Sequence, residues 1–257
     1  MINKPKTAAE YSSRYVELVK RTCLYLATIL GDFQDDLVIV GGLVPTLLIP
    51  EGSLPENEPA HVGTTDLDIG LHIALLNGQR YEGLTERIRR AGFENDVNDE
   101  GNVTRQRWIN SKYGLSIKVD FLIQPINESE EGGKLRNIER DFAAVITPGL
   151  HLVFRDREKI ILKGITIAGE MASREIWVCG PGAFLVLKAL AFKFRGEMSL
   201  MPRPNIAVSS HISTNVLSAM EFSRSRWGAQ SIRLLTCANG EIIGNIKTLN
   251  RIRSGRF

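Results

Sequence analysis

The stretch Gly63-Thr-Thr-Asp-Leu-Asp-Ile-Gly-Leu71 places two aspartates one residue apart in a largely apolar segment. Alternate residues of a β-strand face the same side, so Asp66 and Asp68 point together while Leu67 points into the core. Two carboxylates held this close repel each other and usually need a shared proton, a basic partner or a cation. The segment therefore predicts a strand, expected over Thr65–Ile73, with paired acids on one face.

Upstream of this segment, the apolar run Leu37-Val-Ile-Val40 ends in the pair Gly41-Gly42. It predicts a short buried strand followed by a tight turn. A helix is expected over Leu43–Leu48, because Pro45 would lie in its first turn, where proline is tolerated. Backbone N–H groups after the glycines could contact a phosphate, although a Gly pair alone more often marks a turn.

Downstream, Ile117-Lys-Val-Asp-Phe-Leu-Ile123 places Asp120 in a mostly apolar strand, on the same face as Lys118. A carboxylate is costly to bury there unless it is paired or bound to a cation. Its partner could be Lys118 or an arginine such as Arg105 or Arg107. If the strands are neighbours, it could instead converge with the aspartate pair, and such hard oxygen ligands suit Mg²⁺.

In this order the motifs resemble the nucleotidyltransferases of the DNA polymerase β superfamily, and most of all their AbiEii-like branch from toxin–antitoxin systems. That branch combines a Gly/Ser turn, an Asp-x-Asp strand and a later single-Asp strand. It also carries a helix with a Lys-x-x-Ala-x-x-x-Arg element, whose spacing is matched by Lys188, Ala191 and Arg195. The matches cover roughly Leu37–Arg195, and the ordered set is more specific than any one motif.

The resemblance implies an α/β fold. A mixed, twisted sheet of nucleotidyltransferase type, with helices packed on it, would occupy a domain over residues 1–180. A more helical part would follow over 181–257. The implied activity is metal-dependent transfer of a nucleotidyl group from a nucleoside triphosphate to a hydroxyl acceptor, which could be an RNA end, a protein or a small molecule. The branch also implies a toxin with an antitoxin protein as partner.

The same resemblance implies roles for individual residues. Two Mg²⁺ ions held by Asp66, Asp68 and Asp120 would bind the triphosphate and lower the pKa of the acceptor hydroxyl. Five further residues would contact the nucleotide: Gly41, Gly42, Thr65, Lys188 and Arg195. Lys188 and Arg195 lie about two helical turns apart and share a face, although such a pair taken alone is more typical of a solvated surface.

The C-terminal sequence departs from the family. The family usually continues past its Lys/Arg helix with another acidic element, whereas here Met198-Ser-Leu-Met-Pro-Arg-Pro204 follows and no aspartate occurs after Asp156. We expect an atypical, loosely packed tail from about residue 198 and an activity reduced by the missing acid. A non-catalytic nucleotide- or partner-binding protein that retains the fold is the alternative. A small-molecule nucleotidyltransferase resembling the aminoglycoside-modifying enzymes is a third candidate.

Composition is that of a globular protein, with 43% apolar and 24% charged residues. The segment from Met198 to Phe257 carries a net charge of +6 and leaves −3 for the rest. It could attract nucleic acid or act as a solubilising tail. The longest apolar run, Leu37–Pro50, is too short to span a bilayer, and the N-terminus lacks a signal-peptide pattern, so we expect a cytoplasmic protein without membrane contact.

The remaining pattern predicts the other elements of the fold. Helices are expected over Ala8–Leu30, Tyr81–Ala91 and Pro181–Arg195. Strands are expected over Val103–Ile109, Leu115–Ile123, Ala143–Ile146, Leu150–Phe154, Lys159–Leu162, Ile165–Ile167 and Ile176–Val178. The acidic segment Glu94–Gly101 is expected to form a loop. The three cysteines have no metal or disulfide spacing, and Cys23 is expected to be a buried free thiol.

Overall fold

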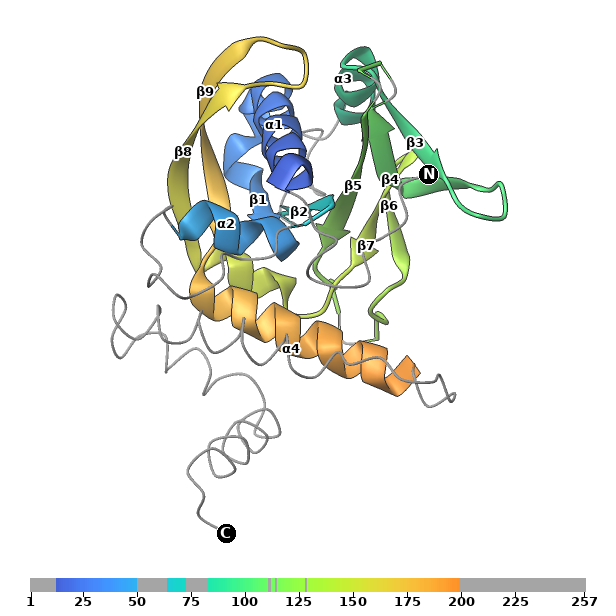
Figure 1. Cartoon of the computed structure of the whole chain (residues 1–257). Helices are drawn as coiled ribbons and strands as arrows, with labels where there is room; N and C mark the ends of the chain where they lie inside the picture. The colour runs from blue at the N-terminus through green and yellow to red at the C-terminus, as the bar shows by residue number, and fades with distance from the viewer. Residues whose placement is uncertain are drawn as a thin grey trace. The chain divides into compact units, whose positions relative to one another are not determined.

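The strand that carries the aspartate pair lies in the middle of a mixed sheet. The computed structural model describes residues 13–49, 64–72, 83–110, 112–113, 115–127 and 129–198. The strands are β1 (Leu37–Val40), β2 (Asp66–Leu71), β3 (Phe93–Val97), β4 (Val103–Asn110), β5 (Leu115–Ile123), β6 (Leu135–Glu139), β7 (Phe142–Ile146), β8 (Arg157–Ile165) and β9 (Met171–Cys179). Within the described part of the chain they form a nine-stranded sheet of order β3-β4-β5-β2-β1-β9-β8, and β7 pairs with both β5 and β6. In Figure 1, β1 lies between two groups of strands. The β8–β9 hairpin is on one side of it, and β2 and β5 are on the other.

Burial along β2 alternates as the sequence predicts. Leu67 and Ile69 are 0% and 2% exposed, while Asp66 and Asp68 are partly exposed on the other face. β1 pairs antiparallel with β2, and β5 pairs parallel with it. The predicted strands Leu37–Val40 and Leu115–Ile123 are confirmed, and the Asp-x-Asp strand is confirmed with narrower bounds.

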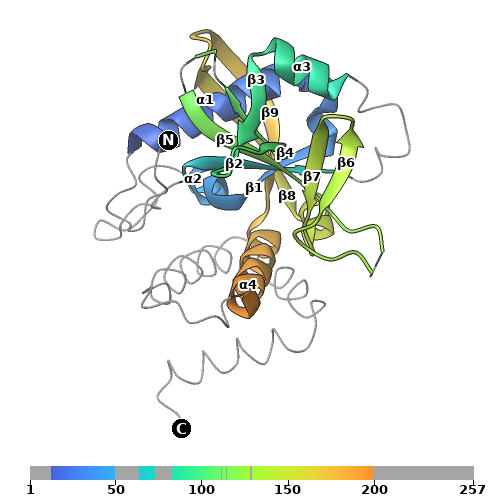
Figure 2. The ribbon, with the colours of Figure 1, turned by 90° about the vertical axis from the view of Figure 1, so that its right-hand side faces the viewer.

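Two helices lie on one side of the sheet, one packed on the central strands and the other on β3. They are α1 (Ser13–Ile29) and α3 (Leu84–Arg90), and both lie on the same side of β1 and β2 (Figure 2). α1 buries one face, including Val19, Cys23 and Leu26, and packs on β2, β8 and β9. Both predicted helices are confirmed within the described residues. α1 is followed by a short 3₁₀ helix, η2 (Gly31–Asp36).

The opposite face of β1 and β2 is partly covered by a second 3₁₀ helix, η6 (Leu150–Phe154). Leu150 packs so closely on β2 that a Cβ added at Gly70 would lie 3.4 Å from its Cδ1. The prediction of a strand over these residues was wrong. A short apolar run does not by itself distinguish a strand from a helical turn, and here Gly149, with φ of 81°, starts the turn. Leu150 and Val153, three residues apart, are the positions that are buried.

Two other sequence predictions need correction. Glu94–Gly101 is not wholly a loop, because β3 covers its first part and pairs antiparallel with β4. Ile165–Ile167 is not a separate strand, since Ile165 ends β8 and Thr166 and Ile167 belong to the turn into β9, closed by the bond from Thr166 N–H to the Glu170 carbonyl. The strands predicted over Lys159–Leu162 and Ile176–Val178 are confirmed and lie in one long hairpin, in which β8 and β9 pair over their full lengths. β6 was not predicted at all.

The chain divides into two compact units, Met1–Cys179 and Gly180–Phe257, and each is described by itself. In the second unit the described element is α4 (Pro181–Met198), which confirms the helix predicted from Pro181. The basic tail, including Cys237, lies outside the described residues, so its predicted loose packing stays a prediction. Among the described helices, none is both long and apolar enough to cross a membrane.

Cys23 provides a test of the core. It is a free thiol, 1% exposed, and burial raises its pKa to about 12. Because the thiolate is the reactive form, we expect iodoacetamide at pH 8 to leave Cys23 unmodified in the native protein and to alkylate it in guanidinium chloride. Peptide mapping by mass spectrometry measures both. Equal modification under the two conditions would show that α1 does not pack on the sheet as described.

Candidate functional site

Parallel pairing of β2 with β5 brings the predicted acids together. Asp68 is the register partner of Asp120, and Asp66 is the register partner of Lys118. Register partners on neighbouring strands point to the same face of a sheet, about 5 Å apart. The three carboxylates of Asp66, Asp68 and Asp120 therefore share one sheet face, as expected if their strands are neighbours.

The carboxylate of Asp120 forms a two-pronged ion pair with Arg107 of β4. Arg107 donates from Nε to Oδ1 at 2.7 Å and from Nη2 to Oδ2 at 2.8 Å. The Asp120 side chain is 11% exposed and that of Arg107 is 37% exposed. Of the partners considered from the sequence, the structure thus selects Arg107, which is also the strand neighbour of Asp120.

This pair lies within a larger group of charges. The hydrogen bond to Asp120 raises the pKa of Arg107, outweighing the opposing effect of burial, and Asp96 and Asp66 add further attraction. Asp96 of β3 also contacts Lys118, with 3.3 Å between Oδ2 and Nζ. Sequence reasoning missed Asp96 because it assigned this residue to a loop. Four carboxylates against the three bases Arg105, Arg107 and Lys118 leave this face with a small excess of negative charge that favours a cation.

Thr64 fixes the first aspartate of the pair. It is 4% exposed, and its Oγ1 lies 2.7 Å from Asp66 Oδ1 and 3.0 Å from the Asp66 carbonyl oxygen. The predicted nucleotide contact Thr65 lies instead in the bend just before β2 and is partly exposed. The sequence does contain the signal for Thr64, since a threonine two residues before an aspartate commonly closes such a turn.

The glycine turn lies directly against the second aspartate. Gly41 has φ of +74°, and a Cβ added there would lie 1.9 Å from Asp68 Oδ2 and 2.8 Å from Asp68 Cγ. Gly41 and Gly42 form the 3₁₀ turn η3 (Gly41–Leu43), which leads into α2 (Val44–Leu48) with Pro45 in its first turn. The predicted helix is confirmed but has only five residues. The turn and the acids therefore form one site.

Lys188 and Arg195 lie in α4 and so belong to the second unit. The Lys188 ammonium is 5.4 Å from the centre of the Phe184 ring, one helical turn earlier. Because each unit is described by itself, the predicted contacts of Lys188 and Arg195 with a nucleotide stay predictions.

The residues present fit one hard cation better than two. Across the described ranges, no three or more His, Cys, Asp or Glu side chains form a group that could hold a metal ion. Mg²⁺, however, commonly takes one or two carboxylates and completes its shell with water and phosphate oxygens. Asp66 and Asp68 match that requirement. Asp120 could join them only if its pair with Arg107 opened.

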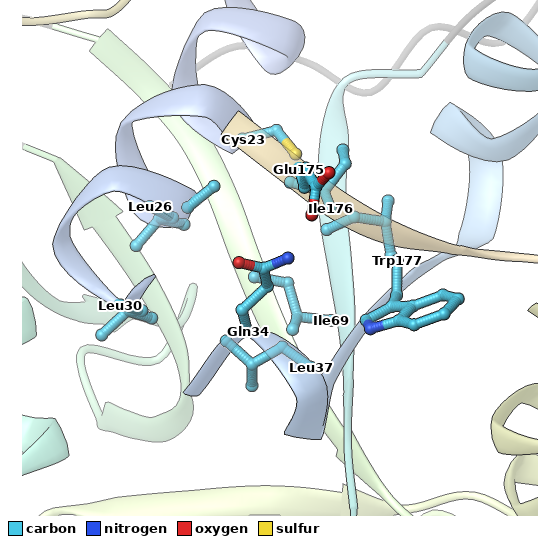
Figure 3. A pocket seen from close by; sticks show the side chains of 11 residues that line it. Cys23, Leu26, Leu30, Gln34, Leu37, Ile69, Glu175, Ile176 and Trp177 are labelled. Carbon is cyan, nitrogen blue, oxygen red and sulfur yellow. The ribbon is translucent and has the colours of Figure 1, made fainter. Parts of the chain in front are cut away.

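An apolar hollow elsewhere in the first unit does not suit a nucleotide. It lies between α1, η2 and β9, and its volume of about 30 Å³ accommodates little more than water. Figure 3 shows side chains of α1 facing those of β2 and β9 across it: Leu26, Leu30, Ile69 and Ile176. Ile69 adjoins Asp68 in β2, so the hollow and the acids lie on opposite faces of the sheet.

Comparison of the chain with family models, with curated proteins and with solved structures found no match. The resemblance to nucleotidyltransferases is therefore carried by the ordered motifs.

Gly41→Ala tests the contact between the turn and Asp68. The new methyl would displace the Asp68 carboxylate and strain the backbone, so we expect loss of the Mg²⁺-dependent activity that the sequence predicts and a destabilisation of about 1–2 kcal/mol. Gly101→Ala is the matched control, because Gly101 has a similar φ of +83° but nothing within 4 Å of its added Cβ. It should show the strain alone and keep its activity. Denaturant melts and activity assays would measure these effects, and equal activity in the two variants would contradict the contact.

Proposed function

We propose that this protein is a metal-dependent nucleotidyltransferase that moves a nucleotidyl group from a nucleoside triphosphate to a hydroxyl acceptor. The observation that carries the proposal is the register of β2 with β5, which sets Asp68 beside Asp120 with Asp66 on the same face. Acids grouped in this way raise the energy of the fold unless a ligand or partner compensates for their repulsion. A site for a cation and a polyphosphate explains why they are grouped.

In the proposed reaction, the acceptor oxygen forms a bond to the α-phosphorus, and the bond from that phosphorus to pyrophosphate breaks. A Mg²⁺ ion held by Asp66 and Asp68 would neutralise phosphate charge and stabilise the leaving pyrophosphate. Thr64 keeps the Asp66 carboxylate oriented, and Gly41 leaves room for Asp68 beside the turn. Asp120, once released from Arg107, would accept the proton of the acceptor hydroxyl.

The acceptor could be an RNA end, a protein side chain or a small molecule, and a toxin paired with an antitoxin protein is the biological setting that the motifs suggest. Incubation with each α-labelled triphosphate, Mg²⁺ and either total RNA or total protein tests the reaction and sorts these acceptors. Label transferred to one of them supports the proposal, and the Asp68→Asn variant serves as the blank.

One observation favours a second function, that of a non-catalytic nucleotide- or partner-binding protein. Both oxygens of Asp120 are engaged by Arg107, so the third acid is held as a structural ion pair in the described state. Triphosphate binding without turnover over a range of acceptors would favour this function.

Asp68→Asn should separate function from folding. Transfer should fall by roughly a hundred-fold or more, because the amide is a poor ligand for Mg²⁺ and leaves transition-state charge unstabilised. Stability measured by thermal melts in EDTA should be unchanged or slightly higher, since repulsion with Asp66 is relieved. Asp99→Asn is the control for the loss of one negative charge, because Asp99 is exposed to solvent. A destabilisation of several kcal/mol would instead identify Asp68 as a structural acid.

Mg²⁺ and a triphosphate together should raise the melting temperature. A ligand that binds only the folded state at a hundred times its Kd adds about 2.7 kcal/mol of stability. Mg²⁺ with a nucleoside monophosphate should add less, because fewer phosphate oxygens reach the metal. Differential scanning fluorimetry over a triphosphate titration would show the shift. Identical curves for triphosphate and monophosphate would argue against a triphosphate site.

A further inference from the structure

The ion pair between Arg107 and Asp120 joins a nearly buried acid to a base that is partly exposed to solvent. Its geometry is that of a rigid two-pronged hydrogen-bonded fork, with distances of 2.7 and 2.8 Å. Asp120 is nearly buried, whereas more than a third of the Arg107 side chain is exposed. The Arg107 side chain can therefore contact a ligand at the surface of the sheet while the backbone of β4 stays in place.

This resting arrangement conflicts with the proposed chemistry. Both oxygens of Asp120 accept hydrogen bonds from the Arg107 guanidinium, so neither is open to an acceptor hydroxyl or to a metal ion. Asp120 can therefore contact an acceptor hydroxyl only after Arg107 has moved away. Asp96 and Asp66 also attract the Arg107 guanidinium to this face. Another anion is therefore needed to draw it away from Asp120.

A triphosphate meets that requirement. The guanidinium fork matches phosphate oxygens as well as it matches a carboxylate, and a triphosphate carries several negative charges against the single charge of Asp120. Lys118, another base on this face, lacks the guanidinium fork and pairs with Asp96 rather than with Asp120. Arg107 is thus the base best placed to exchange an aspartate for a nucleotide.

We propose that Arg107 is a triphosphate-binding residue that holds Asp120 in the absence of nucleotide and releases it when the polyphosphate enters. This inference rests on the proposed function and deepens it, since it makes availability of the proposed base depend on occupancy of the donor site. A monophosphate, which cannot extend as far along the site, would leave the pair closed. The device would keep the acid from activating an acceptor before the donor is bound.

Calorimetric titration with Mg²⁺ and each α,β-methylene triphosphate, which cannot be cleaved at that linkage, tests the inference on the full chain. Arg107→Gln should weaken triphosphate binding by roughly ten- to a hundred-fold, the range for a charge-assisted contact, and should change monophosphate binding little. Arg107→Lys should lie between this variant and the wild type, since it keeps the charge and loses the fork. Arg105→Gln is the matched control, because this exposed arginine lies two residues away on the same face of β4. It should change the affinity by less than about three-fold, the effect of a screened surface charge.

Asp120→Asn provides a test of opposite sign that does not depend on how the Arg107 variants fold. It frees the arginine from its competitor, so triphosphate should bind more tightly, and the gain should disappear when Arg107→Gln is added. The Nε–H signal of Arg107 in ¹⁵N spectra should also move on addition of triphosphate and stay in place with monophosphate.

The possible failures are distinguishable. A wild-type protein that binds no triphosphate would overturn both the proposed function and this inference. A wild-type protein that binds triphosphate, with Arg107→Gln and Asp120→Asn binding it equally well, would overturn the inference alone. An Nε–H signal unmoved by saturating triphosphate would do the same.

Discussion

Repulsion among carboxylates on one face of the sheet is the constraint to which the surrounding structure responds. The in-register pairing of β2 with β5 places Asp68 beside Asp120, and the i to i+2 spacing of β2 adds Asp66. The neighbouring strands supply compensation, with Arg107 on β4 against Asp120 and Lys118 on β5 against Asp96. Acids still outnumber bases on this face, and such an excess of negative charge favours a bound cation.

The apolar side of the same strands determines where the acids stand. Leu67 on β2 and its register partner Val119 on β5 are both 0% exposed, and α1 packs on both strands. A slip of one residue would turn these side chains to the open face and force the aspartates into the core. The hydrophobic effect thus enforces the alignment that electrostatics opposes, so the core and the site are set by the same strand register.

Local sequence patterns predict an element correctly where the signal lies within the element itself. Alternation predicted β2, and the Gly pair followed by proline predicted the turn into α2. Local patterns fail where an element depends on a contact with another part of the chain. The polar sequence of β3 is typical of a loop, and it forms a strand because it pairs with β4. The sequence narrows the partner of Asp120 to a few nearby bases. The choice of Arg107 follows from the antiparallel register of β4 with β5, which the sequence of either strand alone does not determine. The bond of Thr64 to Asp66 follows from their i to i+2 spacing, whereas the family motif begins at Thr65.

The Arg107–Asp120 pair links the two candidate functions physically. As a permanent contact it would be an ordinary way to neutralise a nearly buried acid, and the fold would then serve binding alone. As an exchangeable contact it becomes part of a catalytic cycle in which one anion replaces another on the same guanidinium. The exposure difference within the pair favours exchange, because the acid is held in place by its strand while the base retains access to solvent and to any polyphosphate that approaches this face. Under the proposed function, the choice between catalysis and binding alone depends on how strongly Arg107 prefers a carboxylate to a phosphate.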